Sequence, residues 1–204
     1  MRLLRMIAPA IPYLAVMIGL YALHSAWVAM VGYHLGMIGV LCLCRGWRFA
    51  RMRISPALRG WLLVAALVGL SVGGGIYLCW PLLGSPDLLR AALSRIGIAP
   101  ATWPLFILYF CAVNPWLEEF FWRGYLHDAA RGVTLNDLLF AGYHLLVLIM
   151  FFAWPWLVLT LVLLTASAWT WRQVNRVSDS MLLSTICHLF ADAGILLTVW
   201  ALVR

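Results

Sequence analysis

The sequence predicts an all-α protein, a polytopic transmembrane helix bundle of about seven spans, with six to eight as the range. Hydrophobic residues make up 65% of the chain and charged residues only 10%. Such a chain has too little polar surface to cover a water-soluble globule. We expect residues 1–204 to form a single integral membrane domain, because about seven spans of ~20 residues with short loops use the whole length.

Seven apolar runs carry this prediction, at 7–24, 26–44, 61–83, 102–124, 137–153, 156–171 and 180–203. The first follows a basic segment, as in a signal peptide. Its apolar part is longer than the ~7–15 residues usual there, so we expect a retained helix. The fifth and sixth runs are short and separated by "WPW" at 154–156. A tight hairpin and one broken helix both fit this pattern.

The arginines predict the orientation. All 14 basic residues are arginine. With a cytoplasmic N-terminus and seven spans, the inner segments hold eleven of them, namely Arg2, Arg5, Arg45, Arg48, Arg51, Arg53, Arg59, Arg123, Arg131, Arg172 and Arg176. Arg90, Arg95 and Arg204 remain outside, which is a strong positive-inside bias. The net charge of +7 therefore indicates topology and contact with anionic lipid, and we expect no nucleic-acid partner.

Ionisable residues inside spans are costly and tend to be functional. Here they are His34, Glu118, Glu119, His144, His188 and Asp192. The predicted spans bring the two glutamates, His144 and His188 to one layer, roughly 8–12 Å below the inner surface. We interpret His34 as a packing or hydrogen-bonding residue. The simplest alternative is that all these groups only hold helices together.

The stretch "NPWLEEFFWRGY" contains both glutamates of the chain. Glu119 precedes Arg123 by four residues, the favourable order for an ion pair on a helix. Glu118 points about 100° away from Glu119, so we expect Glu118 to face the bundle interior while Arg123 holds Glu119. Asn114 shares the face of Glu118. Pro115 lacks a backbone donor, so a kink is expected just before the glutamates.

Three short motifs resemble one family. "EEFFWR" matches the EExxxR motif of the CAAX protease and bacteriocin-processing (CPBP/ABI) family of glutamic-type intramembrane endopeptidases. "FAGYH", from Phe140 to His144, looks like its FxxxH motif. "HLFAD", from His188 to Asp192, looks like its third motif, in which a histidine is followed four residues later by Asn or Asp. The motifs occur in the family's order, on separate spans, within a core at about 102–195.

The resemblance implies an endopeptidase that cuts a membrane-embedded or membrane-anchored protein, or a peptide precursor, near the cytoplasmic face. Glu118 and His144 would activate a water molecule, and His188 with Asp192 would stabilise the oxyanion. The supporting residues would be Glu119, Arg123, Phe140 and Asn114. The compact chain is similar to prokaryotic members, which places it in an inner or cell membrane.

The chemistry agrees with this assignment, because amide hydrolysis needs a base for water and donors for the oxyanion. Glu118, His144 and His188 have the ligand types of a zinc site, so zinc is the alternative to the cofactor-free reaction that we expect. A non-catalytic membrane protein of the same fold, such as a bacteriocin self-immunity factor or a scaffold, is the other alternative. Asp192 would act as a protonated donor or, as we favour, accept a hydrogen bond from His188.

Overall fold

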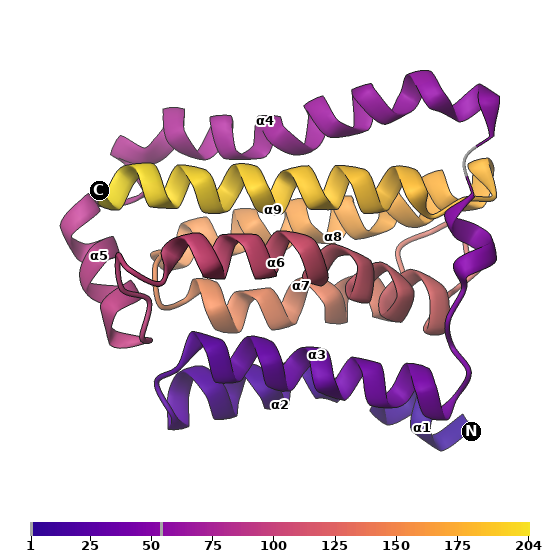
Figure 1. The fold of residues 1–204 in the computed structure, drawn as a ribbon, viewed down its shortest axis with the longest axis horizontal. Helices are drawn as coiled ribbons and strands as arrows, with labels where there is room; N and C mark the ends of the chain where they lie inside the picture. The colour runs from indigo at the N-terminus through magenta and orange to yellow at the C-terminus, as the bar shows by residue number, and fades with distance from the viewer. Residues whose placement is uncertain (1, 54) are drawn as a thin grey trace.

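The computed structural model describes residues 2–53 and 55–204, and this part of the chain contains helices and no strands. The predicted all-α bundle is therefore confirmed. Most of the long helices run roughly along one direction (Figure 1). The elements are α1 (Arg2–Ile7), α2 (Ala10–Val16), η1 (Met17–Ala22), α3 (Ala26–Leu43), η2 (Phe49–Met52), η3 (Pro56–Leu58), α4 (Arg59–Leu83), α5 (Pro86–Arg95), α6 (Trp103–Glu118), η4 (Glu119–Tyr125), α7 (Leu135–Leu148), α8 (Trp154–Ser178) and α9 (Leu182–Val203).

Each predicted apolar run corresponds to a helical segment, but the segments differ in length. Among the described residues, four helices are long and apolar enough to cross a membrane: Ala26–Leu43, Pro56–Leu83, Trp154–Ser178 and Leu182–Val203. Two apolar helices are shorter, Ala10–Ala22 and Leu135–Leu148. The run at 102–124 is filled by α6 and the π-helical η4, which follow one another without a break. The span count is therefore approximate.

The fifth and sixth runs form a hairpin. α7 and α8 are separate helices that pack against each other, joined by a short turn. α8 also extends to Ser178, further than the predicted end at 171. α5 was not predicted. It lies at the end of the bundle away from the N-terminus (Figure 1), with Leu89 and Leu93 buried.

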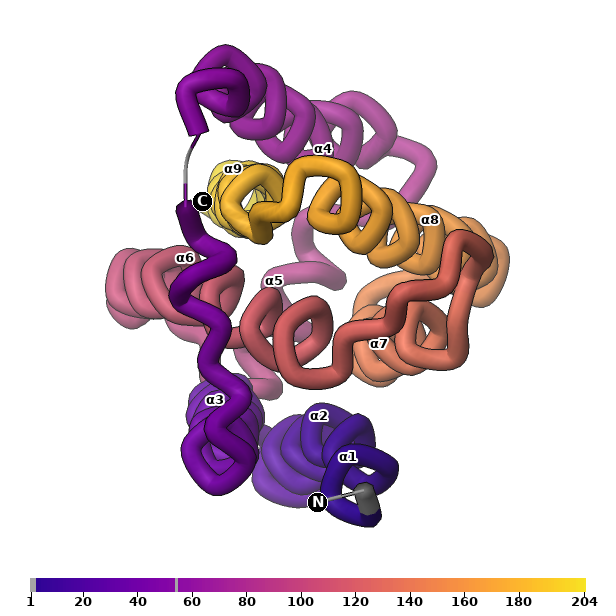
Figure 2. Tube along the Cα trace, turned by 90° about the vertical axis from the view of Figure 1, so that its right-hand side faces the viewer, coloured from indigo at the N-terminus to yellow at the C-terminus, as the bar shows by residue number. Residues whose placement is uncertain are grey.

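α4 lies on the outside of the bundle and packs mainly on α9, as Figure 2 shows. Glycines make this close contact possible. A Cβ atom at Gly73 would lie 2.2 Å from the carbonyl oxygen of Gly194, and one at Gly69 would lie 2.1 Å from the carbonyl oxygen of Cys187. Small residues at such crossings let two backbones approach and gain dispersion contacts.

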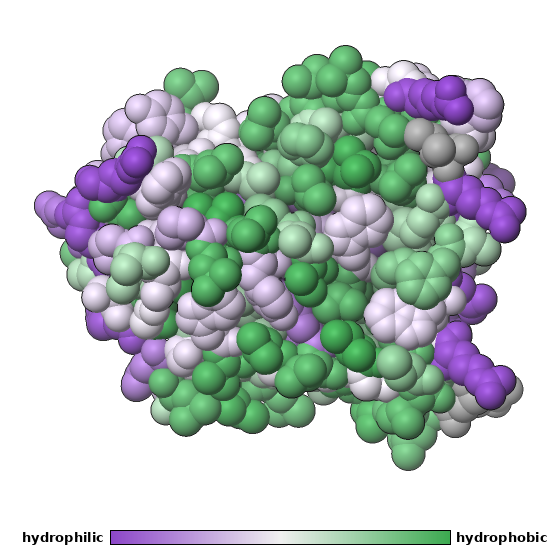
Figure 3. Space-filling model, viewed as in Figure 1, coloured by the Kyte–Doolittle hydropathy of each residue, from purple (hydrophilic) through white to green (hydrophobic). Residues whose placement is uncertain are grey.

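The loops that follow α3, η4 and α8 meet at one end of the bundle. There the carbonyl oxygen of Arg51 accepts a 2.7 Å hydrogen bond from the amide of Met181, and Arg51 donates to the carbonyl of Asn175 at 3.0 Å. At the opposite end Arg90 donates to the carbonyl of Val203 at 3.1 Å. Hydrophilic residues thus gather at the two ends of the bundle, with a mainly hydrophobic band between them (Figure 3).

Candidate active site

Glu118 ends α6 in the centre of the bundle and is only 1% exposed. Its Oε1 accepts a 2.7 Å hydrogen bond from the hydroxyl of Tyr33 on α3 and another from the hydroxyl of Tyr143 on α7. Its Oε2 accepts no hydrogen bond from the described residues and lies 3.5 Å from Nε2 of His188. One carboxylate oxygen is therefore held by two donors, while the other faces an imidazole.

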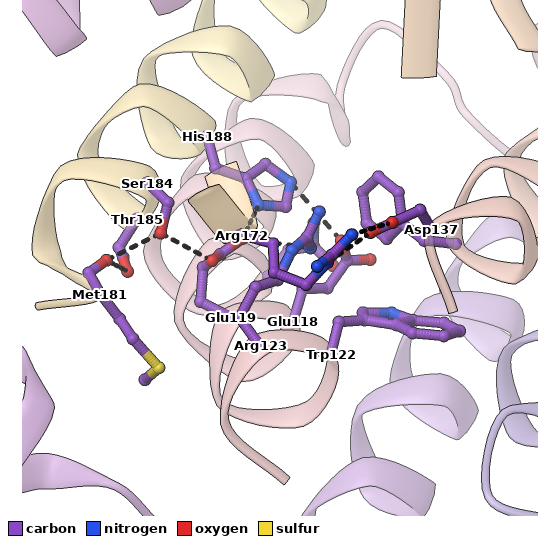
Figure 4. A network of polar contacts seen from close by, with 12 residues as sticks. Glu118, Glu119, Trp122, Arg123, Asp137, Arg172, Met181, Ser184, Thr185 and His188 are labelled. Atoms are coloured by element: carbon purple, nitrogen blue, oxygen red, sulfur yellow. Dashed lines mark hydrogen bonds and ion pairs between the residues drawn. The ribbon is translucent and has the colours of Figure 1, made fainter. Parts of the chain in front are cut away.

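Glu119 begins η4 and is fully buried on the side of α9 (Figure 4). Its Oε2 accepts a 2.8 Å hydrogen bond from the hydroxyl of Ser184. Its Oε1 lies 3.2 Å from a terminal nitrogen of Arg123 and 3.3 Å from Nδ1 of His188. The predicted pairing of Glu119 with Arg123 agrees with this geometry, and the contact with His188 is an addition to it.

The segment that carries the two glutamates departs from α-helical geometry where η4 begins. α6 continues through Pro115, so the helix is not interrupted before the glutamates. The π-helical turn starts at Glu119, after Glu118. Such turns occur frequently at functional sites, because they change the direction of successive side chains. The irregularity expected just before the glutamates therefore lies at the second of them.

Arg123 is 3% exposed, and its guanidinium group is enclosed by aromatic rings. It lies 4.1 Å from the ring centroid of Phe140 and 5.0 Å from that of Trp171. Neither terminal nitrogen makes a well-aligned hydrogen bond within the described residues, although one is within ion-pair distance of Glu119. The ring faces and the carboxylate thus together compensate the buried charge.

His188 connects the two glutamates and Asp192. Its ring stacks on Trp171 with centroids 4.7 Å apart, which fixes the ring plane. Its Nε2 lies 3.6 Å from Oδ1 of Asp192, within ion-pair range but longer than a hydrogen bond. Instead, the side-chain amide of Asn114 donates a 3.1 Å hydrogen bond to Oδ2 of Asp192.

His34 is joined to the same network through Asn114. Its Nε2 lies 3.2 Å from Oδ1 of Asn114, and its Nδ1 lies 3.1 Å from the hydroxyl of Tyr109. The amide oxygen of Asn114 can only accept, so Nε2 carries the proton and Nδ1 accepts from Tyr109. The interpretation of His34 as a hydrogen-bonding residue agrees with these contacts.

His144 is connected to Glu118 through the hydroxyl of Tyr143. Its Nδ1 is 2.8 Å from the carbonyl oxygen of Phe140, and its Nε2 is 3.1 Å from the hydroxyl of Tyr143. The hydroxyl of Tyr143 in turn donates to Glu118. The structure therefore brings Glu118, Glu119, His188 and Asp192 together directly, and attaches His144 through one hydroxyl group.

Tyr33 and Tyr143 are the residues that sequence reasoning missed. Both are buried polar side chains on apolar helices. Neither carries a formal charge, so composition does not distinguish them from packing residues. The one local signal is their position, because each immediately precedes a histidine in the sequence.

Glu118, His144 and His188 are the ligands predicted for the zinc alternative. Within residues 2–53 and 55–204, no group of three or more His, Cys, Asp or Glu side chains is placed to hold a metal ion. Of Glu118, His144 and His188, the first and last approach each other, while Nε2 of His144 faces Tyr143. These three side chains do not form a zinc-ligand set as they lie here.

The family model described as "Type II CAAX prenyl endopeptidase Rce1-like" matches residues 100–194. The matched segment contains all three motifs and every residue of the glutamate and histidine cluster except Tyr33 and His34. Over this segment the chain is similar to the CAAX protease (CPBP) family. No curated protein and no solved structure matches the chain.

The similarity to the CAAX protease family agrees with the geometry, because the cluster lies where the three motifs meet. The family is one of proteases, and its members are embedded in membranes. Together with the apolar helices, this indicates an integral membrane protein. α3 lies outside the segment that matches the CAAX protease model, yet it supplies Tyr33 to Glu118. The N-terminal part of the chain therefore helps to form the cluster.

Proposed function

We propose that the protein is an intramembrane endopeptidase that hydrolyses a peptide bond of a membrane-embedded or membrane-anchored protein or peptide. One observation carries the proposal: Oε2 of Glu118 receives no hydrogen bond from the described residues and faces His188 in a buried polar cluster. A carboxylate oxygen without a donor can accept a proton from water, which is the first requirement of amide hydrolysis.

In this reaction Glu118 acts as the base for the attacking water, together with His144. The water oxygen attacks the carbonyl carbon of the scissile bond, and the leaving nitrogen receives a proton. His188 and Asp192 lie on the other side of Glu118 and stabilise the oxyanion. Glu119 supports the site by binding Nδ1 of His188, which directs Nε2 of the same ring toward Glu118.

We infer that cleavage occurs near the cytoplasmic side. The arginine-rich loops share one end of the bundle, and the positive-inside rule assigns that end to the cytoplasm. Glu118 is followed by the seven residues of η4 before the chain leaves the helix at this same end. A substrate segment that enters from the inner leaflet would reach the cluster within about two helical turns.

We propose that the reaction needs no metal ion. The supporting observation is that Glu118 and His144 both bind the hydroxyl of Tyr143, an arrangement suited to proton transfer. Cleavage should therefore continue in the presence of a zinc chelator. Loss of activity on chelation, with recovery when zinc is added, would establish the zinc alternative.

The experiment that tests the proposed function compares the membrane proteomes of cells that carry the wild type, Glu118→Gln or Asp179→Asn. Glutamine keeps the shape of the side chain but cannot take a proton from water. We expect one or more uncut precursors to accumulate with Glu118→Gln only. Asp179 is a matched control, because its side chain is 97% exposed at the end of α8.

The purified protein gives the second arm of this experiment. Cleavage of the accumulated precursor by wild-type protein, and its loss by a factor of about 10² or more in Glu118→Gln, would establish the enzyme. Identical proteomes, with Glu118→Gln inserted at normal abundance, would favour the non-catalytic alternative, a self-immunity factor or scaffold of the same fold.

A further inference from the structure

Two tyrosine hydroxyls surround Oε1 of Glu118, and their other contacts differ. The hydroxyl of Tyr33 accepts a 3.2 Å hydrogen bond from the indole of Trp122 and donates to Glu118 at 2.7 Å. Its donor and one acceptor position are therefore in use, and its remaining contact is a long one, 3.5 Å to the hydroxyl of Tyr143. Among the described residues, the hydroxyl of Tyr33 makes no hydrogen bond to a histidine that could take its proton onward. The hydroxyl of Tyr143 continues instead to His144.

The hydrogen bonds of His144 show what its Nε2 requires. The carbonyl oxygen of Phe140 can only accept, so Nδ1 of His144 carries a proton and donates at 2.8 Å. In the neutral imidazole, Nε2 is then an acceptor. It lies 3.1 Å from the hydroxyl of Tyr143, which has a single proton. That proton faces two acceptors, Oε1 of Glu118 and Nε2 of His144.

Within the described residues, this hydroxyl links the two groups that the resemblance assigns to water activation, Glu118 and His144. Tyr143 is 5% exposed and its ring stacks on Trp122 with an interplanar angle of 2°, so the ring has little freedom to leave this position. The hydroxyl proton can nevertheless rotate about the C–O bond between its two acceptors.

We propose that Tyr143 is a catalytic relay that passes a proton between Glu118 and His144, and that Tyr33 is a positioning residue that holds the Glu118 carboxylate. The proposal rests on the proposed proteolytic function and adds two residues to it. Glu118 first takes one proton from the attacking water, whose oxygen bonds to the scissile carbonyl carbon.

The carboxyl group then turns about its Cγ–Cδ bond, which exchanges its two oxygens and brings the protonated one to Tyr143. It donates to the oxygen of Tyr143, while the original Tyr143 proton moves to Nε2 of His144. Tyr143 is neutral before and after this exchange, and His144 becomes an imidazolium. When the carbon–nitrogen bond breaks, the electron pair goes to the leaving nitrogen, which receives a proton from His144. Glu118 and His144 return to their starting states, so the relay is balanced over one turnover.

A double-mutant cycle distinguishes the two tyrosines. Tyr143→Phe and His144→Ala should each lower kcat by about 10²-fold, the scale of general acid–base catalysis, with little change in KM. The double variant should be no slower than His144→Ala, because both changes interrupt one path. Tyr33→Phe should lower kcat by about tenfold, and this loss should multiply with that of His144→Ala.

Tyr21→Phe is the matched control. Its hydroxyl donates to the carbonyl oxygen of Leu146 on α7, away from the Glu118 carboxylate that Tyr33 and Tyr143 bind. Thermal unfolding of each variant checks that the fold is kept. Multiplicative losses for Tyr143→Phe with His144→Ala, or a Tyr143→Phe enzyme with wild-type kcat, would overturn the relay.

Infrared difference spectroscopy keeps the test separate from proteolysis. The spectrum of wild type minus Glu118→Gln contains the bands of the Glu118 carboxyl group. Recorded again in the Tyr33→Phe and Tyr143→Phe backgrounds, these bands should move, since each variant removes one donor to Oε1. Shifted bands in a protein that cleaves nothing would overturn the proposed function and the relay while retaining the hydroxyl contacts. Unshifted bands in a cleaving protein would overturn the hydroxyl assignment alone.

Discussion

The side-chain amide of Asn114 donates a 3.1 Å hydrogen bond to Oδ2 of Asp192, and the other oxygen of Asp192 lies 3.6 Å from Nε2 of His188. Asn114 and Asp192 come from α6 and α9, which are far apart in the sequence. The donor that fixes Asp192 is therefore an amide on another helix rather than the histidine one turn away. This relationship changes what a substitution at position 192 should do.

Asp192→Asn should keep substantial activity. Its amide oxygen can still accept from Asn114, while its NH₂ group turns toward the substrate as an oxyanion donor. Asp192→Ala should lose about 10- to 100-fold in kcat while remaining folded, because it leaves Asn114 without an acceptor and removes the side chain from the site. Cleavage of the identified precursor in liposomes measures both.

Exchanging the two groups provides the control for Asp192. Asn114→Asp alone should impair activity, since two carboxylates would then face each other. The double variant Asn114→Asp with Asp192→Asn should recover much of the loss by restoring one donor and one acceptor. A fully active Asp192→Ala enzyme would remove this residue from the catalytic group.

Glu119→Gln should destabilise the protein as well as reduce its activity. The change leaves the guanidinium of Arg123 buried and without its carboxylate, which costs about 3–5 kcal/mol of unfolding free energy. Arg123→Met in the same chain should restore much of that stability, because methionine can occupy the space between Phe140 and Trp171 without a charge. Thermal unfolding in detergent measures these differences.

The activity of the Glu119→Gln and Arg123→Met double variant is the second readout. Stability should return while cleavage stays low, because Nδ1 of His188 has lost its carboxylate partner. Recovery of both stability and activity would show that Glu119 serves only to neutralise Arg123.

Gly73→Ala should lower the unfolding free energy by about 1–3 kcal/mol, since the new methyl group would press α4 away from α9. Its Cβ would lie 2.2 Å from the carbonyl oxygen of Gly194. Gly74→Ala is the matched control. A Cβ atom there would have no atom of another helix within 4 Å. This variant should be neutral or slightly stabilising. Equal unfolding temperatures for the two variants would mean that α4 tolerates a looser contact with α9.

Reporter fusions test the orientation on which the depth of the cluster depends. Fusions after residues 55 and 176 should report the cytoplasm, and a fusion near residue 95 should report the outside, because eleven of the 14 arginines would then be cytoplasmic. The opposite pattern at any of these positions would place the three motifs on the other side of the membrane. The spatial cluster would remain, but cleavage near the cytoplasmic face would be ruled out.

The sequence by itself determined the class of fold and pointed to the carboxylates and histidines of the cluster, but not to its two tyrosines. A chain with 65% hydrophobic and 10% charged residues can fold stably only where apolar surface meets lipid, and helices satisfy their backbone hydrogen bonds there. The i, i+4 spacing of Glu119 and Arg123 is a property of any helix, so this pair could be predicted from numbering alone. Phe140 and His144 have the same spacing, so their proximity could be predicted in the same way. The sequence did not show that His144 would bind the backbone carbonyl of Phe140.

Only the tertiary structure decided which groups from different helices meet. Tyr33 lies 85 positions before Glu118, and no periodicity in an apolar helix distinguishes a tyrosine that binds a carboxylate from one that packs. Whether Asp192 binds Asn114 or His188 depends on how far α6 and α9 stand apart, and that distance is set by packing along the full length of both helices. Local sequence fixes the direction of a side chain on its own helix, whereas its hydrogen-bond partner depends on the sum of all interhelical contacts.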